Sequence, residues 1–268
     1  GIGIRTWPGD DKLSDAIRIS CPSNETDMQR LRDAIATIHR PEALLFDLDG
    51  VLADVSASYR EAIRLTAAQF GVQISKEDID TIKAQGDANN DWVVTWRLLN
   101  AAGIDASLAD ITLVFESLYQ GTGDDDPLYQ RERFIGSRDV LIALKQRYRL
   151  AIVTGRPRTD AMRFLLDFNL DTVFDAIVCM EDAPLKPDPA PVQLALARLG
   201  VQRAWMLGDT PDDAVAAREA GVRSPLAELH INKATIRQLS QALGFPWWDK
   251  PAQPCLASRF PYGESISA

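Results

Sequence analysis

The chain has 268 residues, of which 46% are hydrophobic and 25% are charged, and these are the proportions of an ordinary soluble globular protein. No apolar run approaches the roughly 20 residues that a membrane-spanning helix needs, and no signal-peptide pattern is present. The formal net charge of −9 argues against nucleic acid as a partner. Three widely spaced cysteines argue against a disulfide framework, so we expect a cytoplasmic protein with neither membrane nor nucleic-acid partners.

Residues 1–40 begin without a methionine and resemble a piece of another family. The run from Asp15 to Pro22, followed by a helical stretch over about 25–38, is similar to the end of histidinol-phosphate-type aminotransferases. In that family the arginine that matches Arg18 binds the substrate carboxylate or phosphate. The pyridoxal-phosphate lysine of that fold is missing, so we expect a remnant without activity of its own.

The stretch from Ala43 to Asp54 is the one around which the rest of the chain is organised. Its short apolar run predicts a buried parallel strand. That strand delivers Asp47 and Asp49 to its carboxyl end, where open α/β sheets bind ligands, and Gly50 then permits a sharp turn. Two carboxylates at this place suit a divalent cation with one acid left for chemistry. A strand end followed by an ordinary Asp-Gly turn is the alternative interpretation.

The spacing of apolar residues over 55–135 predicts only helices, which are separated by turn signals. The expected helices cover 55–70, a stretch that begins at the capping-box-like Ser75, a stretch through Leu99, and 105–119. Between the second and third helices lies a polar run in which Asn89 and Asn90 either cap a helix or contact a substrate. Trp92 belongs either to a core stripe or to the substrate site.

From residue 137 onward, predicted strands and helices alternate, after an acidic linker over 121–127. We expect strands over 149–154, 175–179 and 203–207, and helices over 137–148, 159–168, 189–199 and 212–220. This alternation predicts an α/β fold: a mostly parallel, Rossmann-like sheet with helices on both faces, joined to an all-helical insert.

The alternating pattern breaks after residue 223. Residues 224–268 resemble an internal piece of ATP-pyrophosphatase-type sulfur transferases, in which the cysteine matching Cys255 can supply sulfur and the pair matching Ser258 and Arg259 lies near phosphate. The nucleotide loop of that family is missing from the sequence. We therefore expect a tail without sulfur-transfer activity, irregular apart from one short helix over 233–243.

Four stretches place acids, a hydroxyl and a lysine in or after predicted strands. They are Asp47-Leu-Asp49-Gly50, Thr154-Gly155-Arg156, Lys186-Pro187, and Gly208-Asp209 with Asp213. In this order they resemble the four motifs of the haloacid dehalogenase superfamily, and the insert resembles the helical cap of its first subfamily. The run Asn89–Trp92 is further similar to a little-characterised phosphatase-like branch. The resemblance divides residues 41–223 into a core, 41–54 and 136–223, and a cap, 55–135.

The resemblance implies a Mg²⁺-dependent phosphatase that acts on a small phosphorylated metabolite. In that scheme Asp47 is the nucleophile, and Asp49 protonates the leaving group and then activates water. Thr154, which holds phosphoryl oxygens, and Lys186, which balances charge, are the other implied catalytic residues. The implied substrate-binding residues are Gly155 and Arg156 from the core and Asn89, Asn90 and Trp92 from the cap. The implied Mg²⁺ ligands are Asp47, Asp49 through its backbone carbonyl, Asp209 and Asp213.

Two alternatives stay open at this point. A phosphomutase keeps all four motifs and differs in its lid. A non-catalytic module inside a longer histidine-pathway fusion protein is the other, and the missing last strand of the sheet favours it, because an exposed sheet edge costs stability. The dehalogenase branch itself is disfavoured by Asp49, since that branch lacks this second acid. The sequence leaves the oligomeric state open.

Overall fold

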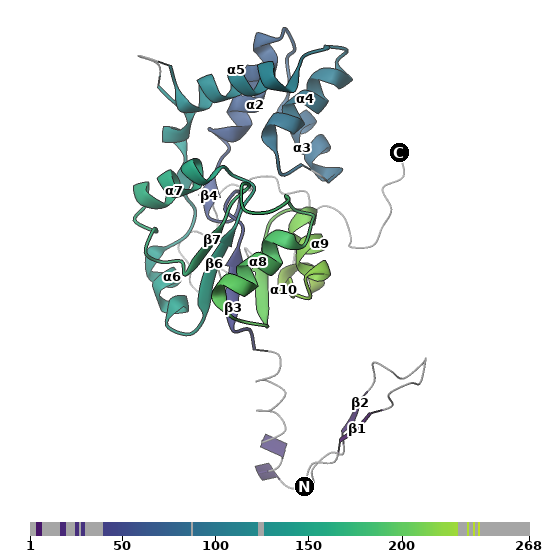
Figure 1. Cartoon of the computed structure of the whole chain (residues 1–268), viewed down its shortest axis with the longest axis vertical. Coiled ribbons are helices and arrows are strands. Elements are labelled where there is room, and N and C mark those ends of the chain that lie inside the picture. Colours follow the sequence, from purple (N-terminus) through teal and green to yellow (C-terminus); the bar gives the residue numbers. More distant parts are fainter. Residues whose placement is uncertain are drawn as a thin grey trace. The chain divides into compact units, whose positions relative to one another are not determined.

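The computed structural model describes residues 40–86, 88–122 and 126–229, together with 4–6, 17–19, 25–26, 28–29, 235, 238 and 241. The chain divides into two compact units, Gly1–Pro41 and Glu42–Ala268 (Figure 1). In the first unit, β1 (Ile4–Thr6) and β2 (Ile17–Ile19) form an antiparallel pair. Within the described part of the chain, no helix has the length and apolar character needed to cross a membrane.

The second unit is built on a parallel sheet of four strands in the order β7-β6-β3-β8. These strands are β3 (Ala43–Phe46), β6 (Arg149–Val153), β7 (Ala176–Val178) and β8 (Ala204–Leu207). Every residue of β3 is buried, as expected for a continuous apolar strand covered on both faces. The predicted α/β fold with a parallel sheet is confirmed.

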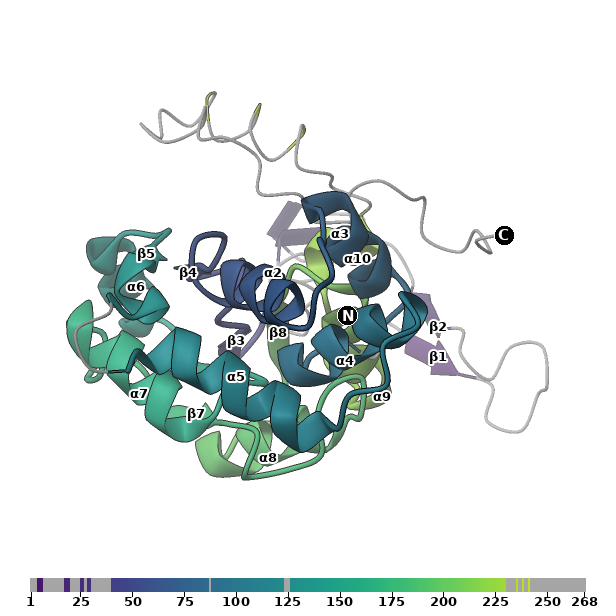
Figure 2. The ribbon, with the colours of Figure 1, turned by 90° about the horizontal axis from the view of Figure 1, so that it is seen from above.

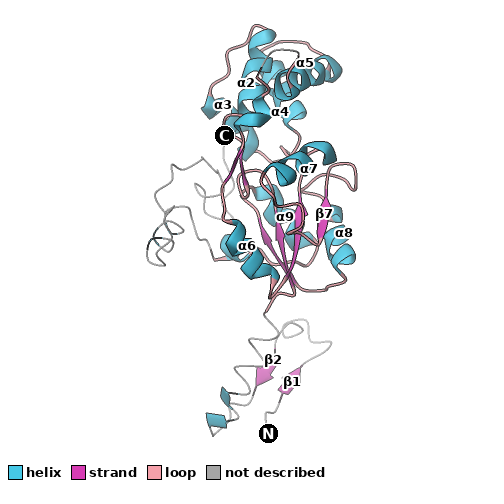
Figure 3. Ribbon diagram, turned by 90° about the vertical axis from the view of Figure 1, so that its left-hand side faces the viewer, coloured by secondary structure: helices cyan, strands magenta, loops and turns pink. Residues whose placement is uncertain are grey.

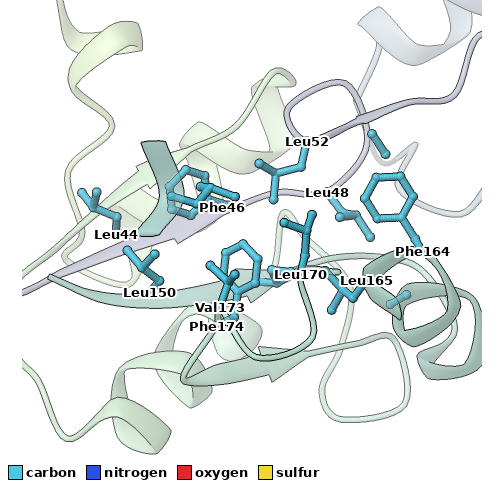
Figure 4. Packing of buried hydrophobic residues seen from close by; sticks show 14 of the residues in the cluster. Leu44, Phe46, Leu48, Leu52, Leu150, Phe164, Leu165, Leu170, Val173 and Phe174 are labelled. Carbon is cyan, nitrogen blue, oxygen red and sulfur yellow. The ribbon is translucent and has the colours of Figure 1, made fainter. Parts of the chain in front are cut away.

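Alternate residues of β3 pack into two different hydrophobic clusters. Leu44 and Phe46 join a cluster with residues of α6 (Arg138–Lys145) and α7 (Arg158–Asp167), part of which is drawn in Figure 4. Leu45 joins the other cluster, with residues of α8 (Ala190–Leu199) and α9 (Pro211–Glu219). Figure 3 shows α6 and α8 on opposite sides of the strands. Each fully buried large apolar side chain stabilises the sheet by roughly 1.5–3 kcal/mol.

The strand order creates a reversal point beside β3. The chain passes from β3 to β6 and β7 on one side and then returns to β8 on the other side. Open α/β sheets bind ligands at the carboxyl ends of the two strands that flank such a reversal. Asp47 directly follows β3 and Asp209 follows β8, so both carboxylates are delivered to this place.

Four helices between β4 and β5 share a hydrophobic cluster of their own. They are α2 (Tyr59–Gln69), α3 (Lys76–Ala84), α4 (Asp91–Ala101) and α5 (Leu108–Gln120), seen from above in Figure 2. The predicted capping box of α3 is confirmed by bonds in both directions between Ser75 and Asp78. The short helix η1 (Leu128–Arg131) follows α5. The division of the chain into a core and a cap stays a prediction.

The entry to the helical insert differs from the sequence prediction. Helix α2 begins at Tyr59 rather than at residue 55, because Asp54 Oδ1 accepts hydrogen bonds from the amide and hydroxyl of Ser56 and holds a turn there. The insert also ends in a strand: β5 (Arg133–Phe134) pairs antiparallel with β4 (Ala53–Asp54). Residues 123–125 of the predicted acidic linker lie outside the described residues.

Among the described residues, the sheet continues beyond β8 by a single bridge. The Met206 amide donates to the Arg223 carbonyl oxygen at 2.8 Å, and α10 (Pro225–Glu228) follows at once. The predicted interruption of the alternating pattern after residue 223 therefore coincides with the last bridge. In the predicted helix over 233–243, positions 235, 238 and 241 are helical. Cys255, Ser258 and Arg259 lie outside the described residues.

Candidate active site

A buried lysine joins two carboxylates at the carboxyl end of the sheet. Lys186 Nζ donates to Asp47 Oδ1 at 2.8 Å, to Asp213 Oδ1 at 2.5 Å and to the Val153 carbonyl oxygen at 3.0 Å. All three N–H groups of the ammonium are thus occupied. Lys186 is 2% exposed and Asp47 is 5% exposed, so these charges interact with little screening by water.

Three carboxylates form a group that fits a metal ion. Oxygens of Asp47, Asp209 and Asp213 all lie within 4.8 Å of one another. Asp209 approaches closely because residue 50 is glycine: a Cβ there would lie 2.1 Å from Asp209 Oδ2, and the backbone φ of +76° is strained for other residues. Carboxylate oxygens are the donors that Mg²⁺ prefers, so the residues present fit this ion.

Without a metal ion, the negative charges of this group outnumber the single positive charge of Lys186. Burial raises the pKa of Asp47 well above its ordinary value, although Lys186 opposes that shift. Burial alone would lower the pKa of Lys186, but the carboxylates of Asp213 and Asp47 outweigh it and raise the pKa overall. The group therefore contains one ammonium and three carboxyl groups, and a divalent cation would favour the ionised form of Asp47.

The loop after β6 brings a hydroxyl and a guanidinium to the same end of the sheet. Thr154 is 4% exposed, and its Oγ1 accepts a hydrogen bond from the Arg156 amide at 3.1 Å. A Cβ at Gly155 would lie 2.6 Å from the Asn89 carbonyl oxygen, so only glycine allows the insert to approach this loop. The loop is thus in contact with the helical insert.

Arg156 is buried between two carboxylates. Its Nε and Nη2 donate to Asp49 Oδ1 at 2.8 and 2.6 Å, and its Nη1 donates to Glu132 Oε2 at 2.9 Å. The other oxygen of Glu132 accepts from the hydroxyls of Ser58 at 3.0 Å and Tyr119 at 2.9 Å. Asp49 is therefore held in position by a network that reaches the N-cap of α2 and helix α5 of the insert. Sequence patterns did not single out Glu132.

We expect Arg156→Gln to lower the free energy of unfolding by about 3–5 kcal/mol, because Glu132 would be left buried without its cation. Arg158→Gln is the matched control two positions along the chain. The Arg158 side chain is 44% exposed and pairs with Asp182, so its loss should change stability by less than about 1 kcal/mol. Urea denaturation of both variants measures the difference. Equal losses would contradict a structural role for the buried pair.

The predicted insert residues have distinct places. Asn89 Nδ2 donates to the Lys186 carbonyl oxygen and to Asp212 Oδ2, both at 2.8 Å. Asn90 is the N-cap of α4, and its Oδ1 accepts from the amides of Trp92 and Val93. Asp212 was missed at the sequence level, because its only signal is its place in the first turn of α9.

A second set of contacts joins the insert to α7. The Tyr59 hydroxyl and Gln120 Nε2 each donate to the carboxylate of Asp160 at 3.0 Å. Arg163 also pairs with Asp160 and lies 3.9 Å from the centre of the Tyr129 ring. Asp160 is 2% exposed, so its burial is stabilised by the hydrogen bonds and the ion pair that the insert and α7 provide.

A small pocket of about 30 Å³ lies between the insert and the loops of the sheet. The sheet side contributes Asp49, Gly155, Arg156, Pro157 and Met180, and the insert contributes Tyr59, Asn89, Asn90, Asp91 and Trp92. All of the predicted insert residues line it, together with Asp49. Trp92 is held by a hydrogen bond from its Nε1 to Glu116 Oε1 at 3.0 Å.

Sequence comparison matches the chain to one protein family and to curated proteins. Residues 44–227 match the family described as haloacid dehalogenase-like hydrolase. A phosphoglycolate phosphatase from Rhodospirillum rubrum is 31% identical over 226 residues, covering 77% of this chain and 92% of that protein. An imidazoleglycerol-phosphate dehydratase from Phytophthora nicotianae is 46% identical over 213 residues, covering 76% of this chain and 47% of that protein. This chain thus spans about half the length of the Phytophthora relative.

Among solved structures, CbbY from Rhodobacter sphaeroides in complex with xylulose-1,5-bisphosphate is similar with a TM-score of 0.55 and 25% identity. The similarity covers 69% of this chain and 84% of that one.

Proposed function

We propose that this chain, which belongs to the haloacid dehalogenase-like hydrolase family, hydrolyses a small phosphate monoester through a covalent intermediate on Asp47. As a phosphoric monoester hydrolase of that family, it needs a nucleophile, a proton donor and balancing positive charge at one place. The observation that carries the proposal is the convergence of Asp47, Lys186 and Asp213 in one buried, hydrogen-bonded group.

In the proposed first step, a carboxylate oxygen of Asp47 attacks phosphorus and the bond from phosphorus to the ester oxygen breaks. Lys186 offsets the negative charges of Asp47 and of the phosphoryl oxygens, which otherwise repel each other. Thr154 and the backbone amides after it would hold the phosphoryl oxygens. The product of this step is an aspartyl phosphate and a free alcohol.

Asp49 is the proposed proton carrier. It gives a proton to the leaving alkoxide, and its carboxylate then removes a proton from the water that attacks the aspartyl phosphate. Both steps need Asp49 at a fixed place beside the ester oxygen. The two hydrogen bonds from Arg156 to Asp49 Oδ1 support this role, because among the described residues no hydrogen bond occupies Oδ2.

Mg²⁺ is the proposed cofactor. Asp47, Asp209 and Asp213 would hold it together with the backbone carbonyl of Asp49, and when bound it would supply positive charge at the phosphoryl oxygens. The insert would close over the site and exclude water other than the reacting one.

The test is release of phosphate from p-nitrophenyl phosphate by the full chain. We expect EDTA to lower the rate by about 100-fold or more and added Mg²⁺ to restore it. Mg²⁺ should also raise the melting temperature, because it binds only the folded acidic group, and Asp209→Asn should reduce that shift. Hydrolysis that is insensitive to EDTA would contradict the proposed cofactor.

A second candidate is a non-catalytic module of a larger protein. It is favoured by one observation, that this chain spans 47% of a relative whose name denotes a dehydratase. The same assay separates the candidates, because a non-catalytic module would release no phosphate. A phosphomutase would instead return the phosphoryl group to its sugar substrate and release little phosphate from it.

A further inference from the structure

Glu132 lies where the two linkers of the helical insert meet. It directly precedes β5 in the returning linker, 132–135, and β5 pairs with β4 in the outgoing linker, 53–58. One oxygen of the Glu132 carboxylate accepts a hydrogen bond from Ser58, the N-cap of α2, and the other accepts one from Arg156 of the sheet. Both linkers are therefore tied to the same arginine.

Four partners fix the place of the Arg156 guanidinium. Besides donating to Asp49 and Glu132, it lies over two aromatic rings. Its central carbon is 4.8 Å from the centre of the Tyr59 ring and 5.4 Å from that of the Phe164 ring. The side chain of Arg156 is 1% exposed, so water does not compensate its charge. The position of this buried cation therefore depends on its two carboxylate partners.

Only one of these two carboxylates changes charge in the reaction. This inference rests on the proposed function, in which Asp49 gives a proton to the ester oxygen and later takes one from water. While Asp49 is protonated, Glu132 is the one charged partner that the described residues offer to Arg156. Glu132 lies outside the described pocket lining and takes no part in proton transfer, so it stays with Arg156 throughout the cycle.

We infer that Glu132 is a positioning residue for the reaction. From the returning linker it holds Arg156 in place while the charge of Asp49 changes. Arg156 in turn fixes Asp49 Oδ1 with two hydrogen bonds, which keeps the carboxyl group of Asp49 oriented toward the ester oxygen. Without the charge of Glu132, Arg156 would turn toward water or the phosphoryl group, and Asp49 would lose its alignment.

Two esters that differ by one methylene group test the inference. p-Nitrobenzyl phosphate releases an alcohol whose oxygen needs a proton, whereas p-nitrophenyl phosphate releases a phenolate that does not. In single-turnover assays of the full chain, Glu132→Gln should slow release of the alcohol by about tenfold more than release of the phenolate, because a misaligned acid catalyses poorly. Loss of folded protein cancels in the ratio of the two rates, since both esters meet the same preparation.

Asp80→Asn is the matched control for Glu132→Gln. Asp80 is a buried acid of the insert, 6% exposed, and its ion pair with Arg60 joins α3 to α2. Because this pair is not part of the network around Arg156, the control should keep the ratio of the unaltered protein even where it lowers stability.

Glu132→Asp serves where Glu132→Gln does not fold. It keeps the charge beside Arg156 but shortens the side chain by one methylene group. The ratio should then fall by about threefold, because Arg156 is held from a greater distance. In the Asp49→Asn background, Glu132→Gln should leave the ratio unchanged, since its effect passes through Asp49.

An unchanged ratio in Glu132→Gln, or in Glu132→Asp where the former does not fold, would overturn the inference. The same fall of the ratio in Asp80→Asn would also overturn it, as would a further fall in the Asp49→Asn background. Hydrolysis of the phenyl ester alone by the unaltered protein would do so too. If the unaltered protein hydrolyses neither ester, the proposed function itself fails, so the two failures are distinguishable.

Discussion

Asp47→Asn is expected to abolish turnover while leaving the fold intact. The amide keeps the shape of the carboxyl group but cannot attack phosphorus, so single-turnover release of phosphate should fall by about 10⁴-fold or more. Stability should be equal or slightly higher, because burial disfavours the charged form of Asp47 and Lys186 keeps its bonds to Asp213 and Val153. The measurements are single-turnover kinetics and the melting temperature of the same preparation.

Asp188→Asn is the control for this experiment. Asp188 is an exposed acid two residues after Lys186, and its carboxylate accepts a hydrogen bond from the Ala190 amide. Its rate of phosphate release should match that of the unaltered protein. Appreciable turnover by Asp47→Asn would mean that the nucleophile is wrong, and the proposed mechanism would fall with it.

Asp49→Asn is expected to reduce turnover by an amount that depends on the leaving group. Loss of a general acid and base costs about 10²- to 10⁴-fold. An alkyl phosphate needs a proton on its departing oxygen, whereas p-nitrophenolate leaves without one. The first step should therefore suffer more with the alkyl ester than with the aryl ester. Single-turnover assays of both esters, with trapping of the phospho-enzyme, measure that step separately from hydrolysis of the intermediate.

The assays of Asp49→Asn test both proposed roles of Asp49, as proton donor and as base. With an aryl ester, phospho-enzyme should accumulate, because its hydrolysis also needs Asp49 as a base. Equal losses for alkyl and aryl esters would contradict the assignment of Asp49 as the proton donor. Retention of full activity toward alkyl esters would contradict any role in proton transfer.

The sheet was predictable from local patterns, and the grouping of its acids with Lys186 was predictable from the order of the motifs. The strand that ends at Phe46 could be predicted because a continuous apolar run is typical of a strand buried on both faces. The grouping of Asp47 with Lys186, 139 positions away, followed from the motif order and from the rule that parallel strands share one ligand-binding edge. The order of the four motifs was therefore the signal, since a polar residue after a single strand would have been weak evidence.

Glu132 and Asp212 show where such reasoning stops. Glu132 precedes a two-residue strand, and its importance comes from Arg156, a partner 24 positions away that no local pattern specifies. Asp212 looks like an ordinary acid in the first turn of a helix, where its negative charge would interact favourably with the helix dipole. Its bonds to Ala88 and Asn89 arise only when the insert packs against the sheet.

The contacts of Asn89 have a kinetic consequence. This residue bonds to both Asp212 and the Lys186 carbonyl oxygen, and its own carbonyl oxygen rests against Gly155. In the proposed mechanism the insert closes over the site, so these contacts would break each time it opens to release products. The strength of these contacts would then limit the rate of product release rather than the rate of phosphoryl transfer. The signature would be a rapid first turnover followed by a slower steady state, with the slow phase accelerated when Asn89 is shortened.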